Sequence, residues 1–142
     1  MLKKVLASLI FISLIGFGIY QIFSSNSDSL QELKCDLNMQ NCKYKFNKKE
    51  VLISFEPKPI KSLELVNLNI ENLGTYENLK LKIYGLSMDM GELKPKIYKL
   101  NENTYESKVF LSACVLENMR FRAELFDGEK PLGFHFDFEL RQ

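Results

Sequence analysis

The sequence has little of the residue types on which most catalytic sites depend: one histidine, three cysteines and no tryptophan among 142 residues. With His135 as the single histidine, a Ser-His-Asp triad has one candidate base, and a zinc site built from several histidines is excluded. Neither a P-loop nor a GxGxxG motif occurs, so no motif in the sequence indicates nucleotide binding. These absences predict that the chain is not an enzyme.

The sequence also has no large surplus of positive or negative charge. The chain has 19 basic and 18 acidic residues, a net charge of +1. Because nucleic-acid binding needs an excess of lysine and arginine to displace phosphate counterions, no nucleic-acid partner is expected. The 46% hydrophobic and 26% charged residues are typical of a folded protein and not of a disordered chain.

One long uncharged run lies at the N-terminus, from Val5 to Phe23. A helix of this length rises about 28 Å, roughly the thickness of the hydrocarbon core of a bilayer. Two lysines precede the run and Asp28 follows it, so the positive-inside rule places the N-terminus in the cytoplasm. Residues 1–23 are therefore predicted to be a single-pass anchor in the inner or plasma membrane, with the rest outside the cytoplasm, in the periplasm.

A cleaved signal peptide is the alternative for the same residues. The apolar region of a signal peptide usually spans about 7–15 residues and ends at small residues. Here the run is longer and ends in the bulky Tyr20–Phe23, although Ser24–Ser29 offers a weak cleavage site. An uncleaved anchor is the favoured interpretation, and the bulk of the chain is exported in either case.

Two regions follow the anchor. Residues 24–42 begin with the polar stretch SSNSDS, typical of a short flexible spacer, and contain two cysteines. Residues 43–142 have the pattern of a folded domain. Seventeen basic and eighteen acidic residues follow Phe23, so the exported part carries a net charge of −1 and has no polybasic patch for a membrane surface.

Four runs in the domain alternate apolar with polar residues. A period of two predicts strands with one buried face. The runs are Val51–Phe55, Leu79–Tyr84, Met119–Leu125 and Leu132–Leu140.

Three further segments are strand-like. Lys96–Leu100 and Thr104–Leu111 lie on either side of Asn101–Asn103, a predicted hairpin turn. The segment Ser62–Glu71 shifts its apolar phase after its fourth residue, which predicts a bulge or a strand that changes sheets. The whole pattern predicts an all-β fold, an immunoglobulin-like antiparallel β-sandwich of seven to eight strands. A true immunoglobulin domain is not expected, because no tryptophan is available to pack on an inter-sheet disulfide.

The cysteines are interpreted through the expected export. Cys35 and Cys42 bracket six residues, and an oxidising compartment favours a disulfide between them over a redox or metal pair, whose spacings differ. Cys114 is then the odd cysteine, in a predicted loop between two strands. Its thiol is expected to be paired elsewhere, bound to a metal or reactive, or else Cys114 is a small buried hydrophobic residue.

The most distinctive loop is Gly85–Gly91, GLSMDMG. Its two thioethers, Met88 and Met90, point the same way if the segment is extended, and thioether sulfur is a soft ligand that suits Cu(I). Cys114 and Met119 are expected to complete a site of three or four soft ligands. The alternative is that the methionines plug the open end of the core, since methionine fills irregular gaps well.

A strand followed by a glycine-flanked Met-x-Met-Gly loop and a hairpin resembles the YtkA-like and FixH-like exported β-sandwich proteins. The resemblance covers Leu79–Phe126, and the matching positions are Met88, Met90 and Gly91. It implies a membrane-tethered or secreted domain associated with copper handling and cytochrome oxidase assembly. This chain departs from the pattern because no histidine stands beside the motif and three cysteines are added. The missing histidine disfavours Cu(II) and leaves Cu(I) as the expected cargo.

His135 alternates with two phenylalanines, so it is expected on the face opposite the aromatic row, without a special role. The expected function is a membrane-anchored, exported sandwich that handles Cu(I) or assists assembly of a copper-containing membrane complex. The alternative is a metal-free structural or interaction domain that docks onto a membrane or exported protein partner. An enzyme comes third, with the thiol of Cys114 as its one candidate nucleophile.

Overall fold

The computed structural model describes residues 33–112 and 118–141. These residues contain strands and turns but no helix, so none of their elements is a helix able to cross a bilayer. The predicted anchor and Cys114 lie outside the described residues.

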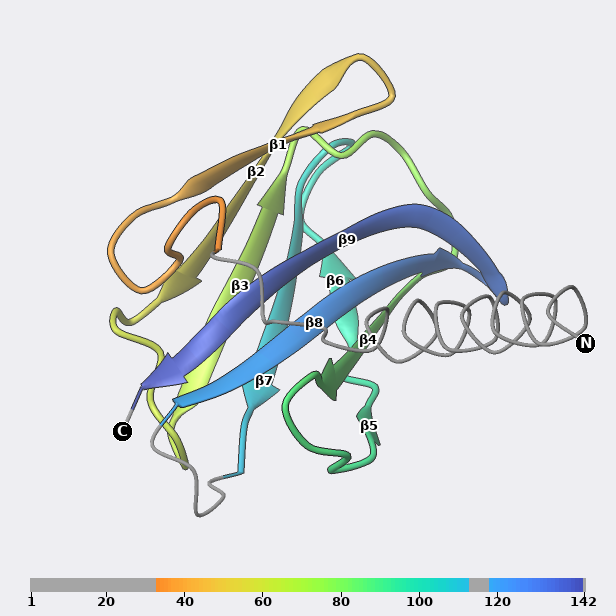
Figure 1. Ribbon diagram of the computed structural model, residues 1–142. Coiled ribbons are helices and arrows are strands. Elements are labelled where there is room, and N and C mark those ends of the chain that lie inside the picture. The colour runs from red at the N-terminus through yellow and green to blue at the C-terminus, as the bar shows by residue number, and fades with distance from the viewer. Residues whose placement is uncertain (1–32, 113–117, 142) are drawn as a thin grey trace, which may run out of the picture. The chain divides into compact units, whose positions relative to one another are not determined.

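In the described part of the chain, nine strands form two antiparallel sheets (Figure 1). The five-stranded sheet has the order β1-β2-β3-β7-β6, and the four-stranded sheet has the order β5-β4-β8-β9. The strands are β1 (Cys42–Phe46), β2 (Lys49–Glu56), β3 (Leu65–Glu71), β4 (Leu79–Gly85), β5 (Glu92–Leu93), β6 (Ile97–Lys99), β7 (Tyr105–Phe110), β8 (Asn118–Asp127) and β9 (Lys130–Arg141).

The two sheets bury a common apolar core between them. Phe55 on β2 lies 4.9 Å from Phe138 on β9, measured between ring centroids, and Phe46 on β1 lies 5.1 Å from Phe134 on β9. Along β3 and β9 the buried residues alternate with more exposed ones, as the period-two pattern predicts. The expectation of an all-β fold of two packed antiparallel sheets is confirmed.

The seven predicted strands all exist, with boundaries that differ by a few residues. The predicted turn at Asn101–Asn103 also exists, closed by a hydrogen bond from the Leu100 amide to the Thr104 carbonyl at 2.9 Å. The structure adds β1, which forms a hairpin with β2, and the two-residue β5. In the β1–β2 turn, Asn47 and Lys48 have φ of 47° and 63°, the left-handed conformation typical of a tight hairpin.

The phase shift in the Ser62–Glu71 segment has a different cause from the predicted one. The register of β3 with β7 is continuous, and Leu65 simply faces outward, where 56% of its surface is exposed. The irregular pairing lies between β8 and β9 instead, where the register shifts between Glu124 and Phe126. Gly133, with φ of 73°, supplies the positive φ in this part of β9.

The connection from β3 to β4 crosses from one sheet to the other and is held by Tyr105 of β7. The Tyr105 hydroxyl accepts a hydrogen bond from the Tyr76 amide at 2.8 Å and donates one to the Gly74 carbonyl at 3.0 Å. Only 1% of Tyr105 is exposed, so the crossing chain is attached directly to the core.

Candidate functional site

The loop Gly85–Gly91 begins at the last residue of β4 and leads into β5. At its start, the Leu86 amide donates to the Arg120 carbonyl at 2.8 Å. Any Cβ at Gly85 would lie 2.4 Å from the Met88 carbonyl oxygen, so only glycine fits there. At the other end the Gly91 amide donates to Oδ1 of Asp89 at 3.0 Å, and Gly91 has φ of 77°. The loop is therefore a tight turn and not an extended segment.

The structure gives the predicted thioether ligands different surroundings. Met88 is 42% exposed and lines a hollow of about 440 Å³ on the loop. Met90 is partly buried and packs against the core, whereas Met119 on β8 is 1% exposed and belongs to the core. Cys114, the fourth predicted ligand, lies outside the described residues.

The loop nevertheless lies beside the start of β8. Gly85 pairs with Phe121, so Met119 is two residues from the strand position that adjoins the loop. Residues 113–117, which include Cys114, precede β8 in the sequence and are not among the described residues. Within residues 33–112 and 118–141, no three or more histidine, cysteine, aspartate or glutamate side chains are grouped so that they could hold a metal ion.

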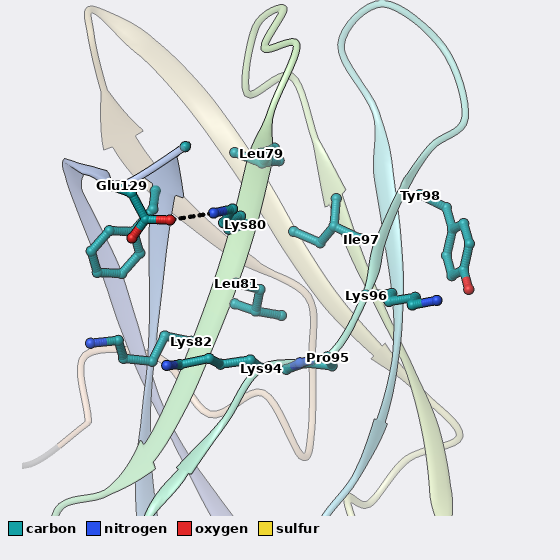
Figure 2. A pocket seen from close by; sticks show the side chains of 12 residues that line it. Leu79, Lys80, Leu81, Lys82, Lys94, Pro95, Lys96, Ile97, Tyr98 and Glu129 are labelled. Carbon is teal, nitrogen blue, oxygen red and sulfur yellow. Dashed lines mark hydrogen bonds and ion pairs between the residues drawn. The ribbon is translucent and has the colours of Figure 1, made fainter.

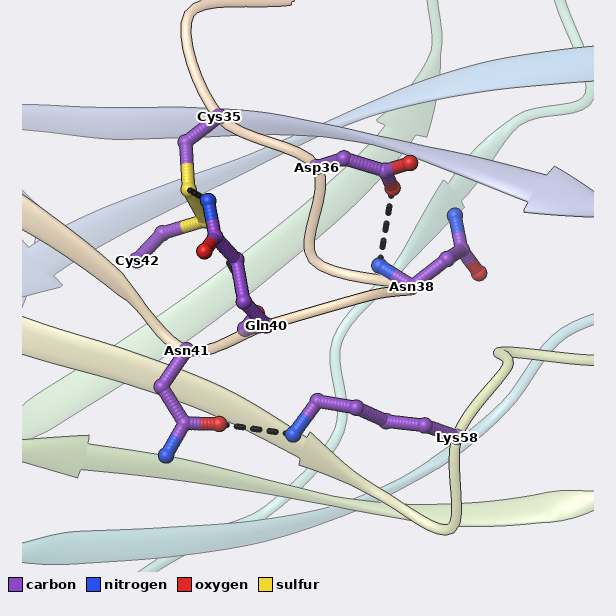
Figure 3. The surroundings of a disulfide bond; sticks show 7 residues. All are labelled: Cys35, Asp36, Asn38, Gln40, Asn41, Cys42 and Lys58. Atoms are coloured by element: carbon purple, nitrogen blue, oxygen red, sulfur yellow. Dashed lines mark hydrogen bonds between the residues drawn. A yellow bond between two sulfur atoms is a disulfide. The ribbon is translucent and has the colours of Figure 1, made fainter.

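The predicted disulfide between Cys35 and Cys42 is confirmed, with their Cα atoms 5.9 Å apart (Figure 3). Cys42 is the first residue of β1 and is completely buried, so the bond fastens the preceding loop to the sandwich. Within the ring, Oδ1 of Asn41 accepts a hydrogen bond from Nζ of Lys58 at 2.6 Å.

Inside the ring, Asn38 attaches the disulfide loop to two other parts of the fold. It is 3% exposed. Its Nδ2 donates to the Glu139 carbonyl of β9, and its Oδ1 accepts from the Ile60 amide, both at 2.9 Å. Leu37 beside it is completely buried. The loop thus forms part of the packed domain.

A second candidate site is a groove of about 460 Å³ between β4 and β6, named here the lysine groove (Figure 2). The residues that line it are Leu79, Lys80, Leu81, Lys82, Lys94, Pro95, Lys96, Ile97, Tyr98, Phe126, Gly128 and Glu129. Leu81 and Ile97 lie between the two strands in Figure 2, whereas the lysine side chains extend outward around them. The groove therefore has an apolar floor and a basic rim.

Two glutamates accompany the four lysines of the rim. Lys80 pairs with Glu129 at 2.5 Å. Lys82 and Lys94 share Glu92 at 3.1 Å and 3.4 Å. The hydrogen bond from Lys82 lowers the pKa of Glu92, and that from Lys80 lowers the pKa of Glu129. Both carboxylates are thus kept ionised by their lysines, and lysines outnumber them.

The sequence pattern did not indicate the groove. It identified Leu79–Tyr84 as a half-buried strand, and the lysines on its outer face are ordinary for such a strand. An additional signal is that Lys94 and Lys96 flank Pro95 in the sequence. This spacing indicates the groove only when it is known that β5 and β6, on either side of Pro95, belong to different sheets. His135 is exposed on β9 opposite Glu124, as its alternation with buried phenylalanines predicts. Comparisons of the chain with protein-family models, curated proteins and solved structures find no match.

Proposed function

We propose that this chain is a single-pass membrane-anchored protein whose exported, immunoglobulin-like sandwich docks onto a partner protein at the lysine groove. The uncharged Val5–Phe23 run supports the anchor, and its flanking charges support export to the periplasm. The disulfide between Cys35 and Cys42 is consistent with an oxidising compartment.

The strand order supports the immunoglobulin-like class. Sheet β2-β3-β7-β6 and sheet β5-β4-β8-β9 have the arrangement of the ABED and C′CFG sheets of that class. The hairpin strand β1 extends the first sheet by one strand. The class itself says nothing of function, because such sandwiches carry many unrelated functions.

The observation that carries the docking function is the half of β4 that is unpaired on one side. Among the described residues, Leu79–Lys82 pair with β8 on one side and with no strand on the other. An unpaired strand edge offers main-chain donors and acceptors to a second polypeptide. Beside this edge, Tyr98 is 54% exposed on the groove wall, and exposed aromatic side chains are frequent in protein interfaces.

The docking function is tested by photo-crosslinking in the cells that produce the protein. A photoreactive phenylalanine analogue replaces Tyr98 in the full chain, and a control chain carries it at the exposed Lys45 of β1. A discrete adduct from position 98 that is absent from position 45, and that disappears when Lys80 and Lys82 are both changed to glutamate, supports docking. Equal adducts from both positions, or none, contradict it.

Cu(I) handling is the second candidate function, for which the sequence provides the resemblance to YtkA-like and FixH-like proteins. The favouring observation is that Met88 is exposed on a hollow beside the start of β8. Met88 and Met90 are the proposed ligands, joined by Cys114 or Met119. Since Met119 lies in the core, its sulfur could reach a metal at the loop only if the core opens locally there.

The copper function is tested by the stoichiometry of Cu(I) bound to the full chain under reducing conditions. Changing Met88 and Met90 to leucine removes sulfur and keeps apolar bulk, at a cost in stability below about 1.5 kcal/mol each. Binding of one Cu(I) by the parent and none by the double variant supports the site. If the parent binds none, or the variant binds equally well, the loop is only a structural turn.

A further inference from the structure

The unpaired edge of β4 at Leu79–Lys82 results from the path of the chain that follows β4. After β5 pairs with Ile83 and Tyr84, the chain leaves this sheet and joins the other sheet as β6. Pro95 at the crossing has no amide hydrogen and cannot donate to β4. The Lys96 carbonyl accepts a hydrogen bond from Oγ of the buried Ser107 at 2.8 Å, which holds the crossing against β7. The edge of β4 is thus left open by the fold.

The two faces of this open edge differ in chemistry. Leu79 and Leu81 face the groove floor, together with Ile97. The alternate residues Lys80 and Lys82 lie on the outer face, and Nζ of Lys82 is 5.1 Å from the centroid of the Phe126 ring. A strand added here would meet apolar side chains on one face and ammonium groups on the other, because side chains alternate along a strand.

We propose that the partner contributes an extended segment alternating apolar and acidic residues, which adds as a strand to the edge of β4 at Leu79–Lys82. This inference rests on the proposed docking function and names its partner chemistry. Four residues of open edge span about 13 Å, so a segment of roughly four to six residues covers it. Its acidic side chains face Lys80 and Lys82 of β4, with Lys94 at the rim, and its apolar side chains enter the groove.

Charge complementarity selects this occupant. Lysine outnumbers glutamate around the groove, whereas the residues after Phe23 as a whole carry a charge of −1, so positive charge is concentrated locally. The competing explanation is that the lysines only protect an open edge from association with other strands, a common use of lysine on edge strands. A small amphipathic anion is a different occupant, which would fill the floor without using the main chain of β4.

The test uses the full chain, isotope-labelled, in a non-ionic detergent. The probe is a fluorescent, end-blocked octapeptide alternating valine and glutamate. One comparison peptide replaces each glutamate with lysine, and another places proline at two central positions. Binding is measured by anisotropy, and hydrogen exchange of the amides of Leu79–Lys82 is measured by NMR.

The expected result is saturable binding of the valine–glutamate peptide, with slower exchange of amides in Leu79–Lys82 and no binding of the lysine peptide. The double variant Lys80→Glu and Lys82→Glu should weaken binding at least tenfold. A matched control, Lys49→Glu with Lys108→Glu, changes net charge equally on other strands and should leave affinity within twofold.

Three results would overturn the inference. The first is no binding of the acidic peptide. The second is equal binding of the proline peptide with unchanged amide exchange, which would show charge attraction without strand addition. The third is saturable binding of laurate in the groove that displaces the peptide, which would show a site for a small anion. If position 98 still forms its specific adduct while the peptide does not bind, docking stands and only this partner chemistry is wrong.

Discussion

Arg122 on β8 and Asp137 on β9 lie directly opposite each other and share two hydrogen bonds. Arg122 donates from Nε to Oδ1 at 2.7 Å and from Nη2 to Oδ2 at 2.9 Å. The hydrogen bonds to Asp137 are the main cause that raises the pKa of Arg122. The pair is partly buried and bidentate, so it holds its two strands in register more firmly than an exposed ion pair would.

Changing Arg122 to lysine is expected to destabilise the domain by about 1 kcal/mol, because lysine keeps the charge but cannot form the two parallel hydrogen bonds. The measurement is urea unfolding of the full chain followed by circular dichroism. Changing Lys80 to glutamine breaks the exposed pair with Glu129 and is the control, with no measurable change expected. An equal loss in both variants would mean that the bidentate geometry contributes nothing.

We expect the domain to lose stability at alkaline pH because of the raised pKa of Tyr44. Burial, with the nearby charge of Asp137, raises the pKa of Tyr44 to about 12 from its ordinary value of 10.0. Between these values the folded chain binds more protons than the unfolded chain, so the free energy of unfolding falls as the pH rises through this window. With allowance for partial exposure, the fall should reach about 1 kcal/mol by pH 11.5.

The variant Tyr44→Phe should remove this contribution and change stability little at pH 8, since the ring contacts with Phe134 and Phe136 are retained. Urea unfolding of both proteins at intervals from pH 8 to pH 11.5 makes the comparison. Parallel decline of the two proteins above pH 10 would show that Tyr44 has no such role.

Asn38 should contribute more to the stability of the domain than its place in a loop indicates. Changing it to alanine leaves the Ile60 amide and the Glu139 carbonyl without their partner, which should cost about 2–3 kcal/mol. Asn41→Ala is the matched control, because Asn41 belongs to the same loop and its hydrogen bond to Lys58 is exposed. The expected order of unfolding midpoints in urea is parent, then Asn41→Ala close behind, then Asn38→Ala well below. The reverse order would contradict the assignment.

The disulfide should stabilise the domain by restricting the unfolded chain. For a ring of this size the chain-entropy estimate is about 2–3 kcal/mol. The double variant Cys35→Ala and Cys42→Ala should lose that amount of unfolding free energy in urea. Dithiothreitol should lower the unfolding free energy of the parent but not that of the variant. Non-reducing peptide mapping provides the independent check, because a peptide linking Cys114 to either residue would disprove the pairing.

The sequence could predict the strands because the core needs one apolar face from each long strand. Phe134, Phe136 and Phe138 alternate cleanly and are all buried. The pattern failed for β1, where Tyr44 and Phe46 alternate with lysines over only five residues, too few to distinguish a strand from a spacer. The pattern also gave the wrong cause for the phase shift at Leu65, since an exposed apolar residue cannot be distinguished from a bulge by sequence alone.

The candidate sites show the same limit. The disulfide could be predicted because its two cysteines are close in sequence. The fate of Met119 could not, because a methionine on an alternating strand is equally compatible with core packing and metal binding. The lysine groove depends on which sheet each side of Pro95 joins, a property of the tertiary structure that no local pattern contains.

The β1–β2 turn at Asn47 and Lys48 is exposed, and in Figure 1 it lies at the end of the sandwich away from the Gly85–Gly91 loop. Exposed loop tips tolerate inserted sequence well. An epitope or a small fluorescent label inserted between Asn47 and Lys48 would therefore stay clear of both the Gly85–Gly91 loop and the first residues of β8. Such a reporter would let the protein be followed in cells while the Gly85–Gly91 loop remains uncovered.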